Sequence, residues 1–191
     1  MKKWIALFLT LALTAALFVG CKKNEPSESV SGKHHVQIEI EKYGTIDVEL
    51  DADAAPITVA NFLKLAESGF YNGLNFHRII EGFMMQGGAS QSVAAETIKG
   101  EFSVNGVEND LSHTAGAISM ARAADYDSAS SQFFIVHEDS TFLDGQYACF
   151  GYVTDGMDVV DAICTSVPVT DGNGTVADGY QPVIREIRVL D

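Results

Sequence analysis

The sequence predicts an all-β domain, either a closed barrel or a sandwich, that also contains two α-helices. Short segments with alternating or continuous apolar side chains recur along most of the chain. Stretches rich in Gly, Asn and Ser separate them, and only two stretches have apolar residues at helical spacing. Many short strands with so few helices do not fit the strand–helix alternation of a parallel sheet.

Length and composition fit one folded domain. The chain has 191 residues, of which 47% are hydrophobic and 20% are charged, so disorder along the whole chain is excluded. Its 12 Lys and Arg oppose 26 Asp and Glu, for a net charge of −14. A surface of this sign repels phosphates, and we expect no nucleic-acid partner. The 3 Cys have no spacing that suggests a disulfide scaffold or a metal site.

The first residues predict export from the cytoplasm. Lys2 and Lys3 precede an apolar run from Trp4 to Gly20 that no charge interrupts, as in a secretory signal peptide. The junction before Cys21 resembles the lipobox of bacterial lipoproteins, which implies removal of residues 1–20 and acylation of Cys21, with palmitate for example. The alternative is an uncleaved signal anchor in which Cys21 is incidental. Both hypotheses place the folded domain outside the cytoplasm, attached to a membrane.

Residues 21–35 are predicted to form a flexible tether, and residues 36–191 the folded domain. The tether is rich in Ser, Glu, Lys and Asn and shows no hydrophobic period. The domain then begins with two alternating segments, 36–41 and 46–50, around a short loop that contains Gly44. This pattern predicts an antiparallel hairpin.

Two helices and six further strands follow. The first helix is expected to begin at Pro56, which suits a first helical turn, and to end at Gly69. The second helix is predicted from Met157 to Cys164. The remaining strands are predicted at residues 76–80, 83–86, 118–121, 133–136, 148–153 and 183–190.

Several of these segments contain polar residues in a characteristic order. They are residues 76–88 (FHRIIEGFMMQGG), 118–123 (ISMARA), 130–135 (SSQFFI), 142–145 (FLDG) and 150–151 (FG). In this order they resemble the active-site segments of the cyclophilin family of peptidyl-prolyl cis-trans isomerases. The resemblance extends from about Val36 to the C-terminus. It implies a closed eight-stranded antiparallel barrel capped by two α-helices, with the active site in a groove on its outside.

The reaction of that family requires little chemistry from the protein. Rotation of an X–Pro bond crosses a barrier of about 18–20 kcal/mol and breaks no bond, so we expect no nucleophile, metal or cofactor. The twisted amide nitrogen becomes a better hydrogen-bond acceptor, and a fixed donor there stabilises the transition state. The resemblance assigns this donor to Arg78 and a hydrogen bond with the substrate backbone to Gln86.

Proline itself needs an apolar pocket. From periodicity alone the Phe and Met side chains of these segments would be assigned to the core. The resemblance instead implies a pocket with main-chain contacts along an extended peptide, formed by Phe83, Met84, Ala121, Gln132, Phe134, Phe142, Leu143 and Tyr147. Phe142 stands where well-known cyclophilins have Trp, Tyr147 where His is common, and Arg122 where Asn is usual. The segment 89–97 lacks the Gly-rich loop of many relatives.

The sequence therefore predicts a lipid-anchored extracytoplasmic isomerase, acting as a monomer on proline-containing unfolded or flexible polypeptides. The alternative is a proline-peptide-binding chaperone module with little turnover. A solute-binding lipoprotein would need a longer, two-lobed chain. Cys149 and Cys164 are expected to be buried thiols, with a disulfide left open. His77, His113 and His137 receive no catalytic role.

Overall fold

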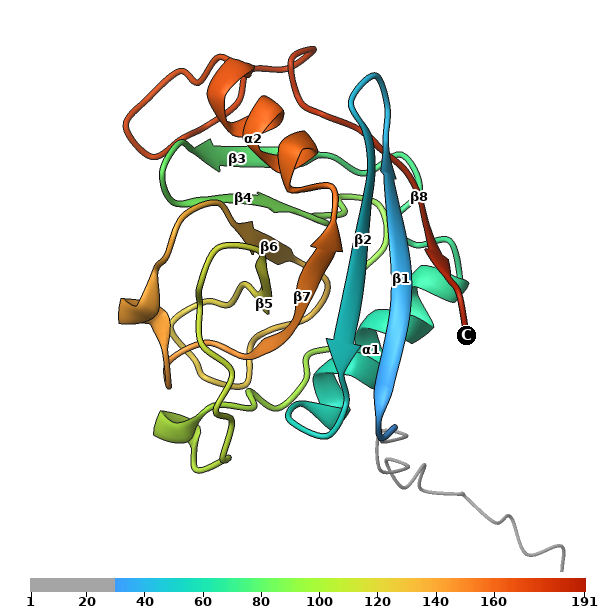
Figure 1. The fold of residues 1–191 in the computed structure, drawn as a ribbon, viewed down its shortest axis with the longest axis vertical. Coiled ribbons are helices and arrows are strands. Elements are labelled where there is room, and N and C mark those ends of the chain that lie inside the picture. Colours follow the sequence, from blue (N-terminus) through green and yellow to red (C-terminus); the bar gives the residue numbers. More distant parts are fainter. Residues whose placement is uncertain (1–29) are drawn as a thin grey trace, which may run out of the picture.

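The structure is a computed structural model that describes residues 30–191, in which one curled antiparallel sheet is accompanied by two α-helices (Figure 1). Two short 3₁₀ helices, η1 and η2, lie in its loops. The elements are β1 (Lys33–Ile40), β2 (Gly44–Asp51), α1 (Pro56–Glu67), β3 (Phe76–Ile80), β4 (Met84–Gly87), η1 (Ser103–Asn105), β5 (Ala117–Met120), β6 (Phe133–Val136), η2 (Thr141–Leu143), β7 (Cys149–Asp155), α2 (Met157–Ser166) and β8 (Ile184–Val189).

The predicted hairpin is confirmed, but its first strand begins earlier than expected. Val36, Ile38 and Ile40 of β1 point into the core, as the alternation predicted. The strand starts at Lys33, because residues 33–35 pair with residues 51–49 of β2. The last three residues of the predicted tether are therefore strand. Their polar side chains gave no signal, since backbone pairing at a strand end does not require apolar residues.

The eight strands do not close into the predicted barrel. Their order is β3-β4-β6-β5-β7-β2-β1-β8, so β3 and β8 are the two edges. The edges meet only beside the start of each strand, where Phe76 N donates to Pro182 O (2.9 Å) and Ile184 N to Leu74 O (2.7 Å). Because β3 and β8 are antiparallel and meet at their first residues, the two strands lead away from each other beyond this point. The outer edge of β3 is instead covered by residues 174–176. The sheet is thus curled and open.

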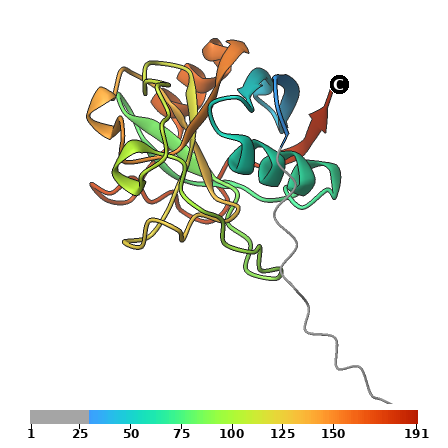
Figure 2. The same cartoon turned by 90° about the horizontal axis from the view of Figure 1, so that it is seen from below.

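The two helices pack at opposite ends of the curled sheet (Figure 1). α1 contacts β8 and β2, and α2 contacts β2 and β4; Figure 2 shows α1 on the side of β1 and β8. Phe62 of α1 reaches the centre of the core, where its ring lies 5.4 Å from Phe133 and 5.3 Å from Phe150. Within residues 30–191 no helix is both long and apolar enough to cross a membrane.

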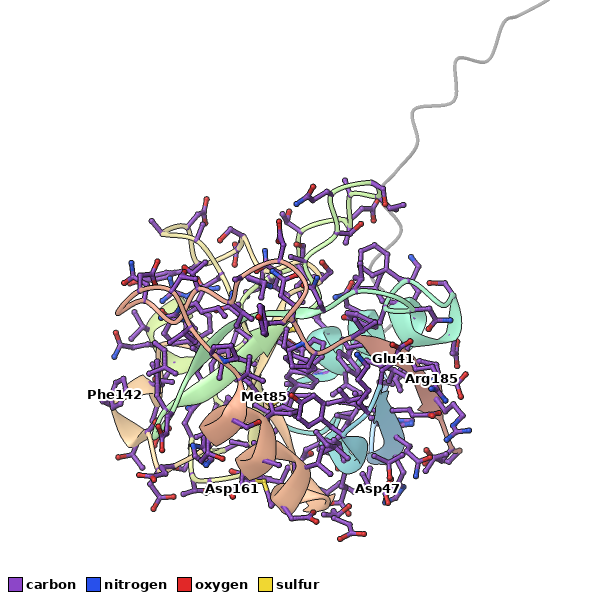
Figure 3. The ribbon with its side chains drawn as sticks, turned by 90° about the horizontal axis from the view of Figure 1, so that it is seen from above. Glu41, Asp47, Met85, Phe142, Asp161 and Arg185 are labelled. Carbon is purple, nitrogen blue, oxygen red and sulfur yellow. The ribbon has the colours of Figure 1, made fainter. Side chains whose placement is uncertain are left out.

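Strands β4, β5 and β6 are buried on both faces. Met85, Ile118, Phe133 and Ile135 point inward to the main core, and Figure 3 shows Met85 in the middle of the molecule. Their neighbours along the strands point outward into a second apolar cluster, which we call the outer cluster. Its buried members are Met84, Ala117, Phe134, Val136, Leu143 and Cys149. Cys149 and Cys164 are free, buried thiols, as predicted.

Candidate active site

The outer cluster brings most of the predicted pocket residues together. Met84, Phe134 and Leu143 form its buried part, with 1%, 5% and 8% of their surface exposed. Phe83, Ala121 and Tyr147 are half-buried and pack against it. The other apolar side chains packed against these buried members are only partly buried, so the cluster lies close to the protein surface, and we call it the apolar floor. Such a surface suits a small ring such as that of proline.

Phe142 lies at the rim of this floor. Two-thirds of its surface is exposed (66%), and its ring lies 5.6 Å from that of Phe83, tilted by 33°. It projects from η2, directly before Leu143. An aromatic side chain held in this way offers apolar surface to a bound polypeptide beyond the proline itself.

A row of side chains crosses the sheet beside the floor. Arg78 on β3 is paired with Gln86 on β4, and Gln86 with Phe134 on β6. Arg78 Nη1 donates to Gln86 Oε1 (3.2 Å), and Gln86 Nε2 donates to Gln132 Oε1 (3.0 Å). Because a guanidinium can only donate, the contact fixes the Gln86 oxygen toward Arg78. The structure thus joins Arg78, Gln86 and Gln132 in one polar network next to the apolar floor.

A loop after α2 holds Arg78 from the other side. Arg78 Nε donates to the main-chain oxygen of Asn173 (2.8 Å). The loop is kept in shape by Asp171, whose Oδ1 accepts hydrogen bonds from the N–H groups of Asn173 (2.9 Å) and Thr175 (3.1 Å). Gly174 has φ +80°, and a Cβ there would lie 2.2 Å from the Ile79 oxygen. Only glycine permits this close approach of the loop to β3.

Behind Phe134 lies a buried histidine that the sequence did not connect with the site. His113 is fully buried and stacks on the Phe134 ring, with 6.1 Å between ring centroids. Its Nδ1 is 2.8 Å from Asp144 Oδ1 and its Nε2 is 3.0 Å from Ser119 Oγ. Since a carboxylate accepts, Nδ1 donates to Asp144 and Nε2 accepts from the Ser119 hydroxyl. The only signal in the sequence was Asp144 within the FLDG motif.

Burial decides the protonation of this histidine. Desolvation lowers the pKa of His113, although the hydrogen bond with Asp144 and its charge act in the opposite direction. The pKa of Asp144 is lowered: burial acts to raise it, but hydrogen bonds from His113 N and Ser112 Oγ, together with the ring, outweigh this effect. At neutral pH the pair is therefore a neutral imidazole and a carboxylate. The imidazole supports one face of the Phe134 ring. Because His113 and Ser119 are both fully buried, the imidazole has no access to substrate.

The remaining predicted residues lie on the opposite rim from Arg78. Ala121 N donates to Gln132 O (2.9 Å), which joins the end of β5 to the polar network. Tyr147 packs edge-on against Phe134, 6.0 Å between centroids. Within residues 30–191 no three His, Cys, Asp or Glu side chains gather in a way that could hold a metal ion.

Comparisons with known proteins agree with this arrangement. Residues 35–189 match the family model described as cyclophilin type peptidyl-prolyl cis-trans isomerase/CLD. The chain is 47% identical to peptidyl-prolyl cis-trans isomerase A of Dickeya dadantii over 125 residues, 63% of this chain and 66% of the relative. It is also 47% identical to isomerase B of Bacillus subtilis, over 62% of this chain and 82% of that protein.

The fold is shared with solved structures as well. The crystal structure of a cyclophilin type peptidyl-prolyl cis-trans isomerase of Cryptosporidium parvum superposes with a TM-score of 0.72 at 28% identity, covering 84% of this chain and 99% of that one. A second crystal structure of the same protein, determined in the presence of the dipeptide Ala-Pro, gives a TM-score of 0.70, covering 82% and 99% of the two chains.

Proposed function

Because the chain belongs to the cyclophilin family and is a peptidyl-prolyl cis-trans isomerase, we propose that it acts on proteins that fold outside the cytoplasm, as a monomer held at a membrane by a lipid on Cys21. The substrates are X–Pro bonds in unfolded or flexible polypeptides. The row of Arg78, Gln86 and Phe134 beside the outer cluster is the observation that supports the catalytic part of this proposal.

Arg78 is the proposed donor to the twisted amide nitrogen. Its Nε is used by Asn173 O and one N–H of Nη1 by Gln86 Oε1, which leaves both N–H groups of Nη2 for the substrate. The guanidinium is fixed from two sides and remains charged at any working pH. It is therefore oriented before the substrate arrives, and the hydrogen bond that it forms strengthens as the amide loses resonance.

The other groups hold the peptide while the bond rotates. The proline ring lies on Met84, Phe134 and Leu143, with Phe83 and Tyr147 at its sides. Gln86 has one N–H of Nε2 left for a substrate carbonyl after its bond to Gln132. Each ~1.4 kcal/mol by which these contacts favour the twisted state over the planar one gives a tenfold acceleration.

An isomerisation assay with a proline-containing peptide tests the mechanism, with Arg78→Ala beside the wild type. We expect acceleration by the wild type that collapses in the variant while its circular dichroism spectrum and unfolding midpoint are retained. A folded Arg78→Ala protein with wild-type turnover would contradict the assigned role. A folded wild type that binds proline peptides without turnover would instead favour the chaperone alternative.

The proposed location depends on the N-terminal sequence alone. Lys2 and Lys3, the apolar run that follows and Cys21 support export and lipidation; residues 1–29 lie outside the described part of the chain. Mass spectrometry of protein extracted from membranes should find acyl chains on an N-terminal Cys21, and Cys21→Ala should release the protein from the membrane. An unmodified Cys21 behind an uncleaved N-terminus would overturn the lipid anchor.

A further inference from the structure

Arg122 occupies an unusual position beside the proposed substrate-binding site on the outer cluster, which we call the groove. It follows Ala121 at the end of β5, and its guanidinium carbon lies over three aromatic rings, 4.6 Å from the centroid of Tyr147, 4.9 Å from Tyr126 and 5.2 Å from Phe102. Tyr147 in turn contacts Phe134 of the apolar floor. The charge of Arg122 is therefore held one aromatic ring away from the place proposed for proline.

Main-chain oxygens fix the same guanidinium in one orientation. Nε and Nη2 donate to Gln146 O (3.1 and 2.8 Å), and Nη1 donates to Ala123 O (2.9 Å). These bonds use three of the five N–H groups of an arginine and leave one on each terminal nitrogen. A side chain held by rings and carbonyls loses little conformational entropy when it binds a further acceptor.

No carboxylate neutralises this group within the described part of the chain. Lys33, Arg185 and Arg188 form salt bridges there, but Arg122 and Arg78 form none. The following loop contains Asp125 and Asp127, and Asp127 Oδ1 is used by Gly100 N (3.0 Å) and Asn105 Nδ2 (2.7 Å). The polar groups between the two arginines are the neutral Gln86 and Gln132. Two arginines that form no salt bridge within residues 30–191 thus lie on either side of the proposed site, on a chain of net charge −14.

We propose that Arg122 forms a carboxylate-binding subsite at the rim of the groove, which makes this isomerase favour X–Pro bonds with an Asp or Glu side chain close to the proline. The inference rests on the proposed binding of proline to the outer cluster. An extended polypeptide that lies along Ala121 passes directly beside the guanidinium. A carboxylate at this place accepts hydrogen bonds from a charged, preoriented pair of N–H groups. The side-chain amide of Gln or Asn can accept the same hydrogen bonds, but it is neutral and lacks the attraction between opposite charges.

Matched short peptides test this subsite. They differ only in one residue, Glu, Gln or Lys, placed one or two positions before or after the proline. For the wild type we expect kcat/KM to be about three- to tenfold higher for the best Glu peptide than for its Gln counterpart, and lowest for Lys. In Arg122→Gln the Glu/Gln ratio should fall to about one, because both peptides then meet an uncharged side chain.

Arg185→Gln is the matched control. It removes the same charge from β8, and Figure 3 shows Arg185 on the opposite side of the molecule from Phe142 at the groove. The Glu/Gln ratio should remain at the wild-type value in this variant. If Arg185→Gln lost the ratio to the same extent, the preference would come from the net charge of the protein, and the subsite would be overturned. Equal kcat/KM values of the wild type for the Glu and Gln peptides would also overturn it.

Binding of the same peptides, measured by fluorescence anisotropy, separates this inference from the proposed function. If the wild type binds the Glu peptide more tightly than the Gln peptide and turns over neither, the subsite stands and the proposed catalysis fails. If it turns over both equally and binds them equally, catalysis stands and the subsite fails.

Discussion

Phe133 and Phe134 are neighbours on β6 with the same side chain, yet they belong to different parts of the molecule. Phe133 points inward, and its ring lies 5.4–5.8 Å from those of Phe62, Tyr71 and Phe76. Phe134 points outward to the apolar floor, where one face rests on His113. Aromatic rings from separate elements enclose the first, and His113, hydrogen-bonded with Asp144 and Ser119, supports the second. The neighbours of a Phe therefore decide whether it packs in the main core or lies in the proposed binding site.

The same contrast holds for Met84 and Met85 on β4. Both are almost fully buried, at 1% and 0% exposed. Met85 packs in the main core, whereas Met84 lies in the outer cluster. The distance from the Met84 sulfur to Arg78 Nη1 is 3.9 Å. Burial alone therefore does not separate a residue of the main core from a residue of the proposed pocket.

Substitution of Arg78 should give the largest effect on activity. Removing one preoriented donor to a transition state costs about 10²- to 10³-fold in rate, and we expect this loss in kcat/KM for Arg78→Ala. Arg78→Lys should recover only a small part, since an ammonium cannot bond Asn173 O, Gln86 Oε1 and the substrate as a planar fork does. The unfolding midpoint should change little, because Arg78 lies on the outer face. A lysine variant with full activity would show that charge alone is required.

The pair Phe133→Leu and Phe134→Leu directly tests the comparison on β6. Phe133→Leu should lower the free energy of unfolding by about 1–3 kcal/mol, through lost aromatic packing, with kcat/KM per folded molecule unchanged. Phe134→Leu should lower kcat/KM severalfold with a smaller loss of stability. Denaturant unfolding and the isomerisation assay measure the two effects. Equal losses of stability and activity in both variants would mean that the two faces are one cooperative core.

Local chemistry made much of the fold predictable. The alternation in β1 and β2, Pro56 at the first turn of α1 and the glycine before Met157 each determine backbone conformation within a few residues. The apolar runs of β4 and β6 were less informative. A strand buried on both faces has no period of two, so the sequence pattern cannot show which residues point outward. The motif resemblance supplied that distinction.

Two features depend on contacts between distant segments and were missed. Whether the sheet closes depends on the offset of β3 and β8, which the hydrophobic patterns of the strands do not encode. His113 and Asp144 are 31 residues apart in the sequence, so the bond between them forms only when the fold brings their two loops together. The row formed by Arg78 and Gln86 could be predicted from the sequence motif, because both residues lie in one hairpin.

His113 should make stability depend on pH. Its pKa in the folded protein is lowered by burial, whereas in the unfolded chain it is the ordinary imidazole value of about 6.5. Below that pH the unfolded chain binds a proton that the folded protein resists, so the free energy of unfolding falls as pH decreases from about 6.5 toward the folded-state pKa. His77, whose pKa is also lowered, acts in the same direction.

His113→Asn separates the two histidines. We expect it to cost about 1–3 kcal/mol at pH 7, since the hydrogen bonds of the buried ring with Asp144 and Ser119 are disturbed. It should also flatten the decline in the free energy of unfolding between pH 7 and 5. Thermal unfolding followed by circular dichroism at several pH values measures both effects, with His77→Asn as the control that retains the contribution of His113. The same slope in wild type and His113→Asn would show that the imidazole titrates normally in the fold.

The loop that holds Arg78 should give the smallest effect, and it sharpens the role assigned to the outer face. Asp171 touches no substrate; its carboxylate orders the loop whose Asn173 oxygen accepts from Arg78. Loss of these bonds in Asp171→Ala should loosen Arg78 and lower kcat/KM about two- to fivefold, as expected for one or two exposed hydrogen bonds. Asp171→Asn keeps an oxygen in the same place and should retain most of the activity.

Because Arg78 also remains bound to Gln86, the loss of kcat/KM in Asp171→Ala should stay far below that in Arg78→Ala. An Asp171→Ala protein with unchanged kcat/KM would mean that β3 and Gln86 alone orient the guanidinium. Equal losses of kcat/KM in Asp171→Ala and Asp171→Asn would show that Asp171 acts on Arg78 through its charge and not through its hydrogen bonds.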